Sequence, residues 1–414
     1  MQGLVVEGGR PLFGEVRIDG SKNGALPILF ATLLCRGACT LRGLPDIGDI
    51  RVSLSILGGM GAVVTEVGEG SYRISCEGCD PARIPLSLTA GLRASSYLLG
   101  ACLARFGYCP PLTTGGCDFG TRPLGYHYAC FEALGAQTDG GTLTAPHRLR
   151  GATYAFPTVS VGGTVNALLA SVTAEGVTRL TGCATEPHVT DFARFLTRAG
   201  ANIQGIGTPT LTVTGVPLLR GCDFTVAPDD MEAGTYLLAA AATRGRVRVA
   251  HAVPKNLSSL TALLTRMGCS VETERDALTL SAPAVLRGVE VETAPYPGFP
   301  TDLHPPTVAL MCTASTPSVL RERVWADRFR YTEGLVKMGA HLVRAGDTLT
   351  VYPARLAATE NTATDLRGGA GILIAALTAS GRSVIRRCGY LARGYGSLPE
   401  KLNALGADVR VCQA

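Results

Sequence analysis

Charged side chains are scarce in this sequence: Asp, Glu, Lys and Arg make up 17% of its 414 residues, and the net charge is +5. Its basic residues are scattered, so nucleic acid is a poor candidate partner, and small anionic substrates fit the charge balance better. No stretch approaches about 18 consecutive apolar residues, and charged residues already occur near the N-terminus. These absences argue against a transmembrane helix and a secretory signal, and they predict a cytoplasmic location.

Motifs for common cofactor and metal sites are also missing. The glycine-rich turn at residues 159–164 is neither a P-loop nor a Rossmann G-x-G-x-x-G motif. Cys76 and Cys79 form a lone C-x-x-C without a second pair or a nearby histidine, whereas a structural zinc site needs four ligands. The 14 cysteines are therefore interpreted as free thiols of a reducing compartment.

The length and apolar content point to a large, well-packed protein. Apolar residues make up 46% of the chain, which excludes general disorder. A chain of 414 residues is too long for one ordinary core, so two domains are expected.

The most informative pattern is a repeat. Six times, a leucine-rich segment of helical periodicity ends in Gly-Ala or Gly-Cys and runs into a strand, at Gly61, Gly135, Gly200, Gly268, Gly339 and Gly406. Each glycine lies where a helix C-cap in the left-handed conformation is expected. Six near-equal units that mix helix and strand predict an internally repeated α/β architecture.

Two loops carry candidate catalytic side chains. Cys117 and Arg122 share a glycine-rich segment, residues 115–123, where a thiol near a cation could be reactive beside an anion site. The alternative is an inert cysteine in an ordinary surface loop. Turn-forming residues at 297–300 predict a rigid, non-helical bend that holds Thr301 and Asp302. Asp302 is then a candidate general base, or a cap of the following helix.

Two further cations lie where helices are expected to begin. Lys22 follows Gly20 and Ser21 ahead of a predicted helix from Ile28 to Leu34, and a lysine beside free N–H groups makes a good anion site. A solvated lysine beside a capped helix is the alternative. Arg93 begins a second predicted helix, where a cation opposes the helix dipole and therefore suggests a ligand role.

These residues belong to a set of motifs that resembles the UDP-N-acetylglucosamine 1-carboxyvinyltransferase family of enolpyruvyl transferases. The motifs occur in family order over essentially the whole chain: 21–23, 92–95, 115–117 with 122–123, 159–162, 299–302, 328–329, 365–369 and 393–395. The cysteine loop separates this family from the related shikimate-phosphate transferases.

The resemblance implies a two-lobed, inside-out α/β barrel with three repeated α/β units in each lobe. One lobe, residues 22–228, would carry the Cys117 loop. Residues 1–21 and 229–414 would form the other lobe, with a double hinge near residues 21 and 229.

The resemblance also implies an activity. The family transfers the enolpyruvyl group of phosphoenolpyruvate to the 3-hydroxyl of UDP-N-acetylglucosamine and releases phosphate. This is the first committed step of peptidoglycan precursor synthesis, and it serves cell-wall biogenesis, cell shape and cell division. The family is the target of fosfomycin. Neither a cofactor nor a metal is expected, and the implied partners are the two small-molecule substrates.

Residue roles carry over by position. Cys117 matches the proton donor, Asp302 matches the proposed base, and Lys22, Arg122 and Arg393 match the cations that bind phosphoenolpyruvate. The positions that match nucleotide-sugar contacts are Asn23, Arg93, Ser160, Val161, Gly162 and Val324. Asp365 and Arg367 match supporting polar residues near the site, and Thr301, beside Asp302, is counted with them among the substrate-binding residues.

Several positions depart from the family pattern. Gly48 stands where a lysine is usual, Asp230 where an arginine is usual, and Ala392 where an aspartate is usual; Gly125 and the run 303–306 also differ. These departures motivate two alternatives to the active transferase: a non-catalytic paralogue that binds the nucleotide sugar, and an enolpyruvyl transferase that uses another acceptor.

Overall fold

The computed structural model describes residues 2–115 and 124–413. These residues fold into two compact units. The first comprises residues 2–19 and 228–413, and the second comprises residues 20–115 and 124–227. The N-terminal segment joins the first unit through β2 (Phe13–Arg17), which pairs in parallel with β16 (Arg246–Ala250) and places Val16 opposite Val249.

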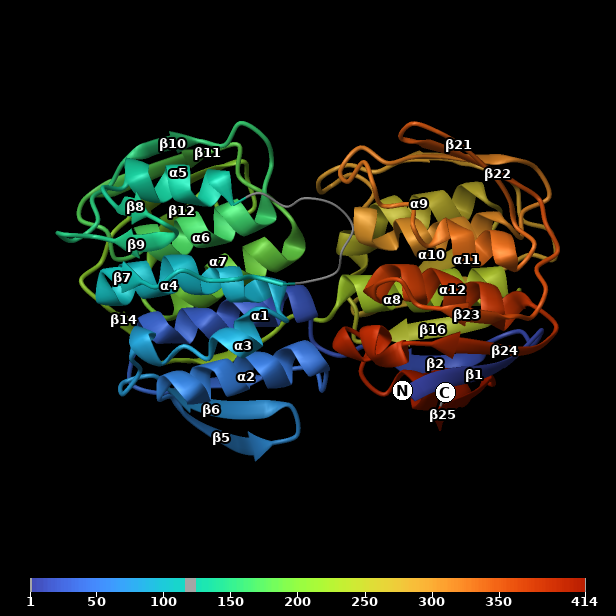
Figure 1. Ribbon diagram of the computed structural model, residues 1–414. Coiled ribbons are helices and arrows are strands. Elements are labelled where there is room, and N and C mark those ends of the chain that lie inside the picture. The colour runs from blue at the N-terminus through green and yellow to red at the C-terminus, as the bar shows by residue number, and fades with distance from the viewer. Residues whose placement is uncertain (1, 116–123, 414) are drawn as a thin grey trace. The chain divides into compact units, whose positions relative to one another are not determined.

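Three four-stranded sheets lie on the outside of the first unit (Figure 1). One has the order β17 (Ser270–Thr273), β18 (Ala277–Ser281), β16, β2. The second has the order β19 (Glu290–Glu292), β20 (Ser318–Arg321), β22 (Thr348–Tyr352), β21 (His341–Ala345). The third has the order β23 (Glu360–Thr362), β24 (Gly381–Arg386), β1 (Gln2–Gly8), β25 (Asp408–Gln413).

The second unit repeats this plan with shorter strands. Two sheets have the orders β15 (Asp223–Thr225), β4 (Cys39–Arg42), β6 (Ser71–Ser75), β5 (Val63–Gly68) and β10 (Thr153–Ala155), β11 (Val177–Thr181), β13 (Thr210–Thr214), β12 (Asn202–Gln204). A three-stranded sheet comprises β7 (Tyr108–Cys109), β9 (Thr142–Thr144) and β8 (Gln137–Asp139), and a short pair comprises β14 (Leu219–Arg220) and β3 (Cys35–Arg36).

Five of these sheets share one connection pattern. A parallel pair is extended by two antiparallel strands, as in β19–β20–β22–β21. The three-stranded sheet keeps the two antiparallel pairings of that pattern. The predicted six-fold α/β repeat, with three units in each lobe, is therefore confirmed by the strand pairing.

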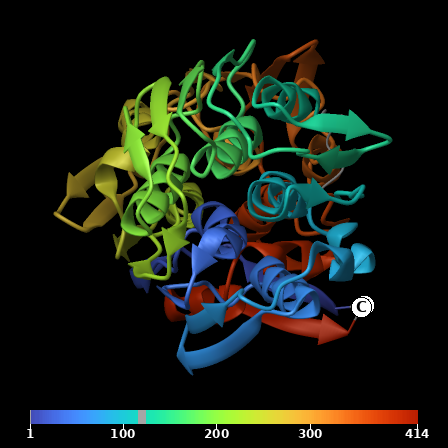
Figure 2. The same ribbon diagram turned by 90° about the vertical axis from the view of Figure 1, so that its left-hand side faces the viewer.

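The helices that enter the core are apolar on nearly every side. In the first unit these are α8 (Asp230–Ala242), α10 (His304–Met311) and α12 (Leu366–Thr378), and in the second α1 (Lys22–Ala31), α4 (Tyr97–Phe106) and α6 (Val161–Ser171). In α12, every residue from Leu366 to Leu377 is buried. A helix that is apolar all round must be enclosed by other elements, and Figure 2 shows the helices of the second unit nearly end-on with strands around them.

Other helices precede the repeat glycines. They are α2 (Gly48–Met60), α5 (Gly125–Ala133), α7 (Pro187–Arg198), α9 (Ser258–Arg266), α11 (Thr332–Lys337) and α13 (Leu398–Ala404), and a short α3 (Leu86–Thr89) lies between repeats. The six glycines have φ between +89° and +111°. At Gly200 the N–H bonds to the Thr197 carbonyl and the next N–H to the Leu196 carbonyl, which is the Schellman arrangement. The predicted left-handed caps are confirmed.

Two local predictions are corrected. The helix predicted from Ile28 begins at Lys22, because Ser21 caps it by accepting a hydrogen bond from the Gly24 N–H at 3.2 Å, and it contains Pro27. The bend predicted at Thr301 and Asp302 is one turn of 3₁₀ helix, η5 (Thr301–Leu303), which continues into α10. The turn-forming residues at 297–300 correctly indicated a turn, but they did not indicate that residues 301–303 take helical backbone angles and lead directly into α10.

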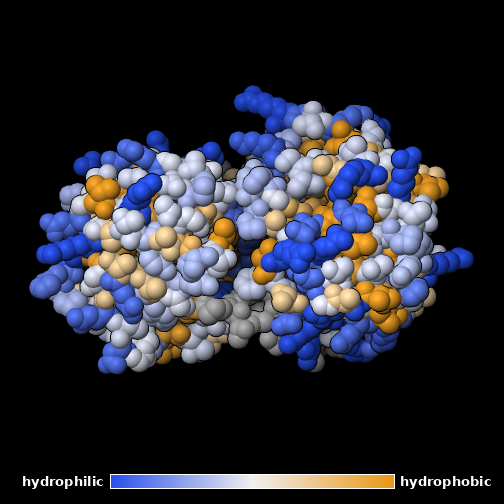
Figure 3. Space-filling view, turned by 90° about the horizontal axis from the view of Figure 1, so that it is seen from above, coloured by the Kyte–Doolittle hydropathy of each residue, from blue (hydrophilic) through white to orange (hydrophobic). Residues whose placement is uncertain are grey.

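The surface carries scattered apolar side chains. The most exposed large ones include Val63, Val285 and Phe13. On the face in Figure 3, apolar residues form separate groups among hydrophilic ones. Within residues 2–115 and 124–413, no helix has the length and hydropathy needed to cross a membrane.

Candidate active site

In the first unit, the candidate base Asp302 lies between two arginines. Its Oδ1 is 2.9 Å from Arg328 Nη1, and its Oδ2 is 3.2 Å from Arg367 Nε. Both arginine side chains are almost fully buried, whereas the Asp302 side chain is 29% exposed. Asp302 therefore does not serve mainly as a helix cap: its carboxylate is oriented by two fixed cations and stays accessible.

Arg367 is positioned by the start of α12. The Asp365 carboxylate caps this helix by accepting hydrogen bonds from the N–H groups of Arg367 and Gly368, both at 3.0 Å. Arg367 Nη1 donates to the Tyr395 hydroxyl at 3.0 Å, and this hydroxyl lies 2.9 Å from Thr235 Oγ1 on α8. Burial lowers the pKa of Arg367, but Tyr395 and Asp302 outweigh burial and raise it, so the guanidinium stays charged.

These contacts bring the N-terminal ends of α8, α10 and α12 together. Asp302 lies in the 3₁₀ turn that leads into α10, Arg367 lies in the first turn of α12, and Thr235 lies near the start of α8. N-terminal helix ends carry partial positive charge. The first unit therefore gathers helix ends and arginines around one accessible carboxylate, an arrangement suited to anionic substrates.

The remaining predicted residues of this unit are close in sequence to the residues above or are linked to them by hydrogen bonds. Arg393 is half-buried at the end of η6 (Cys388–Arg393), two residues before Tyr395. The Thr301 hydroxyl accepts a hydrogen bond from Arg328 at 3.0 Å and donates one to Glu322 at 2.8 Å. The Val324 N–H also donates to Glu322, at 2.8 Å.

In the second unit, Lys22 forms a buried ion pair. Lys22 is the first residue of α1, and its Nζ is 2.8 Å from Asp49 Oδ2 in the first turn of α2. The two side chains are 12% and 8% exposed. The predicted alternative of a solvated lysine is therefore wrong. Asn23 follows in the first turn of α1, and Gly48 begins α2.

The predicted sugar-contacting residues of this unit also lie at helix starts. Arg93 begins a 3₁₀ turn, η3 (Arg93–Ser96), that leads into α4, and its Nη1 donates to Thr114 Oγ1 at 3.2 Å. Ser160 caps α6 by accepting the Gly163 N–H at 3.1 Å, and Val161 and Gly162 are the first residues of that helix.

His127 lies beneath this cluster, and sequence reasoning missed it. Its Nδ1 is 2.8 Å from Asn166 Nδ2, and a Cβ added to Gly162 would come within 3.1 Å of the imidazole. Burial, with a contribution from Arg93, lowers the pKa of His127 to about 4, so the ring is neutral at pH 7. No spacing signal singles out His127, because it lies in an ordinary-looking segment of α5.

Two catalytic predictions, Cys117 and Arg122, fall outside the described residues. The thirteen described cysteines are all free thiols, and eleven are buried. Among the described residues no group of three or more His, Cys, Asp or Glu side chains is arranged to hold a metal ion.

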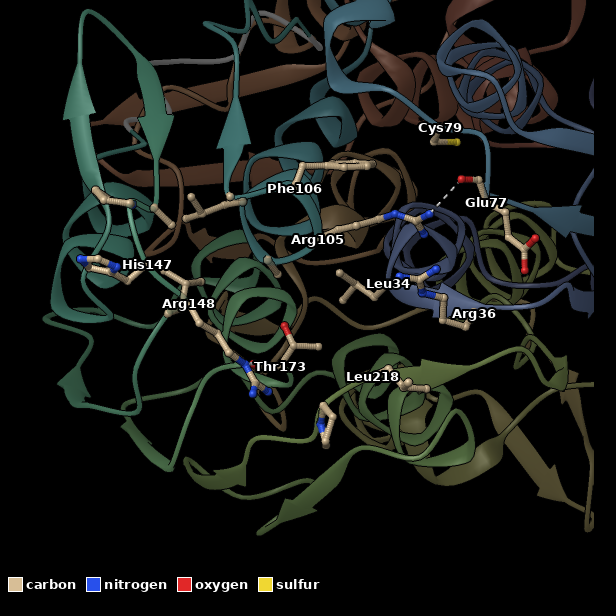
Figure 4. Close-up of a pocket in the computed structure, with 17 residues that line it drawn as sticks. Leu34, Arg36, Glu77, Cys79, Arg105, Phe106, His147, Arg148, Thr173 and Leu218 are labelled. Atoms are coloured by element: carbon tan, nitrogen blue, oxygen red, sulfur yellow. Dashed lines mark hydrogen bonds between the residues drawn. The ribbon is translucent and has the colours of Figure 1, made fainter.

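A cavity of about 700 Å³ lies in the second unit near the opposite, C-terminal ends of α1, α4 and α6, and none of the predicted site residues lines it. Figure 4 shows Arg105 reaching toward Glu77, and Arg148 beside Thr173. Arg105 donates to the carbonyls of Leu33 and Cys76, and Arg148 donates to the carbonyl of Thr173 at 2.8 Å. The carbonyls of Leu33 and Thr173 follow the C-terminal ends of α1 and α6, where a cation interacts favourably with the helix dipole.

Comparison with known proteins places this geometry in a family. The EPSP synthase (3-phosphoshikimate 1-carboxyvinyltransferase) family model matches residues 6–402. The chain belongs to this family of enolpyruvyl transferases. UDP-N-acetylglucosamine 1-carboxyvinyltransferase 3 of Caldanaerobacter subterraneus subsp. tengcongensis is 43% identical over 99% of both chains. The UDP-N-acetylglucosamine 1-carboxyvinyltransferase of Clostridium botulinum is 39% identical over the same shares. The resemblance inferred from the motifs is confirmed.

Solved structures support the fold assignment. The enolpyruvyl transferase NikO from Streptomyces tendae superposes with a TM-score of 0.90 at 29% identity, covering 100% of this chain and 99% of that one. EPSP synthase from Acinetobacter baumannii gives a TM-score of 0.78 at 20% identity with full coverage of both chains, and this likeness shows the fold alone. The predicted inside-out α/β barrel of repeated units is confirmed.

Proposed function

We propose that this protein transfers the enolpyruvyl group of phosphoenolpyruvate to the 3-hydroxyl of UDP-N-acetylglucosamine and releases phosphate, the first committed step of peptidoglycan precursor synthesis. The observation that carries this proposal is Asp302, which is accessible and held between Arg328 and Arg367. Full-length relatives with that activity in their names support the choice of substrates.

The chemistry assigns a role to each candidate catalytic residue. Asp302 takes the proton from the sugar hydroxyl, whose oxygen forms a bond to C2 of phosphoenolpyruvate while Cys117 donates a proton to C3. The C2–phosphate bond then breaks, and loss of a proton from C3 restores the double bond. Lys22, Arg122 and Arg393 stabilise the charge on the phosphate and carboxylate.

The nucleotide sugar would contact residues at helix starts. We propose Asn23, Arg93, Ser160, Val161 and Gly162 in the second unit and Val324 in the first. Backbone N–H groups at helix starts suit the diphosphate of the nucleotide. Thr301, Asp365 and Arg367 support the site, Asp365 by fixing the first turn of α12 and Arg367 by holding Asp302.

We further propose that the two units move as lobes about a double hinge near residues 21 and 229, where the chain passes from one unit to the other. The location we propose is the cytoplasm, because thirteen described free thiols suit a reducing compartment.

Phosphate release from phosphoenolpyruvate, measured with and without UDP-N-acetylglucosamine, tests the function. We expect release that depends on the nucleotide sugar. Release only with a different acceptor would favour a sister enolpyruvyl transferase. The absence of release under every condition would favour a non-catalytic binding protein.

Fosfomycin tests the role of Cys117 separately. This epoxide phosphonate should add once to the intact protein, raising its mass by one inhibitor. The Cys117→Asp variant should form no adduct, whereas an adduct on another cysteine would contradict the assignment.

A further inference from the structure

A buried carboxylate, Glu322, joins the two segments that carry Asp302 and Val324. Glu322 follows β20 and is 1% exposed. Its Oε2 accepts hydrogen bonds from Thr301 Oγ1 and His304 Nδ1, both at 2.8 Å. Both donors flank Asp302, so this oxygen holds the segment that carries the candidate base.

The other oxygen of Glu322 holds a different segment. Oε1 accepts the N–H groups of Val324 at 2.8 Å and Trp325 at 3.0 Å, and the Thr293 hydroxyl at 2.7 Å. Five donors therefore converge on one carboxylate. Burial alone would raise its pKa, but the hydrogen bonds, led by that from His304, lower the pKa of Glu322 to about 2.

His304 orients this carboxylate and is itself held in one state. The fully buried ring receives a hydrogen bond at Nε2 from the Tyr331 hydroxyl at 2.7 Å, which leaves the ring proton on Nδ1 to donate to Glu322. Phe329 and Tyr331 pack edge-on against the ring, with centroids 5.1 and 5.4 Å away. Burial lowers the pKa of His304, in agreement with a neutral ring.

A chain of hydrogen bonds connects this cluster to the candidate base. Arg328 Nη1 donates to the Thr301 hydroxyl at 3.0 Å and pairs with Asp302 at 2.9 Å. Thr301 in turn donates to Glu322. A shift of Glu322 would therefore move Thr301 and change the geometry between Arg328 and Asp302.

We propose that Glu322 is a positioning residue of the transfer reaction, and that His304, fixed by Tyr331, is the donor that orients it. Glu322 keeps the base-carrying segment, residues 301–304, in one arrangement with the sugar-binding segment, residues 324–325. This inference rests on the proposed function for its catalytic consequence, but the arrangement itself can be tested without activity.

Trp325 makes that test direct, because it is the single tryptophan of the sequence. The backbone N–H of Trp325 donates a hydrogen bond to Glu322, so the fluorescence of Trp325 reports the order of the sugar-binding segment. His304→Leu removes the donor while keeping a side chain of similar size. His304→Gln can still donate to Glu322 and accept from Tyr331. Ser318→Ala is the matched control. Ser318 is buried at the start of β20, whereas Glu322 follows the end of that strand, and the Ser318 hydroxyl accepts a hydrogen bond from the Val289 N–H at 3.1 Å.

We expect His304→Leu to raise acrylamide quenching of Trp325 about two-fold and to lower kcat about ten-fold or more, as for the loss of a group that supports a catalytic network. His304→Gln should stay within about two-fold of the unaltered protein in both quenching and kcat. Ser318→Ala should lower the melting temperature but change neither quenching nor kcat. Unchanged quenching and kcat in His304→Leu would overturn the proposal, as would equal losses in His304→Leu and His304→Gln.

If His304→Leu fails to fold, Tyr331→Phe replaces it, because that change removes only the hydroxyl that fixes the histidine tautomer. We expect smaller changes in the same direction, about three-fold in kcat, and no change would overturn the proposal. If the unaltered protein releases no phosphate while quenching responds as expected, the proposed function and the catalytic role of Glu322 fail together, whereas the arrangement that Glu322 holds between residues 301–304 and residues 324–325 stands.

Discussion

At the scale of single residues, the buried charged side chains among the candidate residues are held by specific partners. Lys22 pairs with Asp49, and Arg367 contacts Asp302 and Tyr395. A buried charge is expensive unless it is paired and hydrogen-bonded. The same contacts that stabilise these side chains therefore also fix the positions from which they can meet an anionic substrate.

The Lys22–Asp49 pair separates stability from activity. Lys22→Ala should lower the free energy of unfolding by about 3 kcal/mol, because it removes the Lys22 cation from a buried ion pair with Asp49. The double variant Lys22→Ala with Asp49→Ala should recover most of this loss, yet release phosphate no faster than Lys22→Ala. Urea denaturation and the phosphate assay measure the two effects. If the double variant regained activity, Lys22 would have no role in binding phosphoenolpyruvate.

At the scale of elements, helix ends do most of the positioning. In each unit two buried helices begin at a side-chain cap, Asp229 and Asp365 in one and Ser21 and Ser160 in the other, while a 3₁₀ turn leads into the third. A cap fixes the first turn of a helix. The candidate site residues lie in or beside these first turns, so their placement follows from how the helices begin.

The start of α8 also contains a carboxylate with an altered titration. Glu232 is nearly fully buried, accepts the Asp19 N–H at 2.9 Å and lies 2.6 Å from Lys401 Nζ. Burial outweighs the attraction of Lys401 and raises the pKa of Glu232 to about 7. Because its folded pKa exceeds its unfolded one, the contribution of Glu232 to stability is full below about pH 4.5 and is lost as the pH rises to about 7.

Glu232→Gln should remove that pH dependence. Between pH 4.5 and 7, the difference in free energy of unfolding between the unaltered protein and the variant should change by up to about 3 kcal/mol. Urea denaturation at a series of pH values measures it. Glu400→Gln, which alters an exposed carboxylate on α13, is the control and should leave the slope of unfolding free energy against pH unchanged. Equal slopes for Glu232→Gln and the unaltered protein would contradict the assignment.

The repeat glycines give a second prediction at this scale. Gly200 has φ of +107° and open space where a Cβ would be, so Gly200→Ala should destabilise the protein by about 1 kcal/mol through backbone strain alone. Gly58→Ala is the matched control, because Gly58 is exposed inside α2 with no neighbour to clash. It should stabilise by about 0.5–1 kcal/mol. Thermal denaturation distinguishes the two, and a neutral Gly200→Ala would show that the left-handed cap is dispensable.

At the scale of the whole molecule, the chain builds two units of the same plan. The N-terminal strands in residues 2–19 belong to the unit formed by residues 228–413. Within the described residues, the chain therefore passes between the units twice, after residue 19 and after residue 227. Each unit carries its own set of candidate residues at the starts of its buried helices. The double hinge proposed near residues 21 and 229 would allow substrate binding to move the units.

This coupling predicts a change in overall dimensions. The radius of gyration from small-angle X-ray scattering should fall when UDP-N-acetylglucosamine is added, and phosphoenolpyruvate alone should change it less. Arg93→Ala should abolish the response if Arg93 binds the nucleotide sugar. An unchanged radius at saturating nucleotide sugar would exclude closure of the two units as a step of binding.

Much of this protein was determined by its sequence. The spacing of Gly61, Gly135 and their four counterparts predicted six α/β repeats, because each position requires a left-handed backbone that glycine adopts without strain. The motifs around Asp302, Asp365 and Arg393 predicted the family and the candidate residues, since they are local in sequence.

The tertiary structure decided which side chains meet. Asp49 holds Lys22, Tyr395 holds Arg367, and Glu322 with His304 lies behind Thr301 and Asp302, although these partners are far apart in sequence. His127 is a second case, because its contact with Asn166 depends on how α5 packs against α6. The periodicity of a sequence indicates which face of an element is apolar. Long-range hydrogen bonds instead depend on how separate elements pack, and no fixed spacing in the sequence predicts that packing.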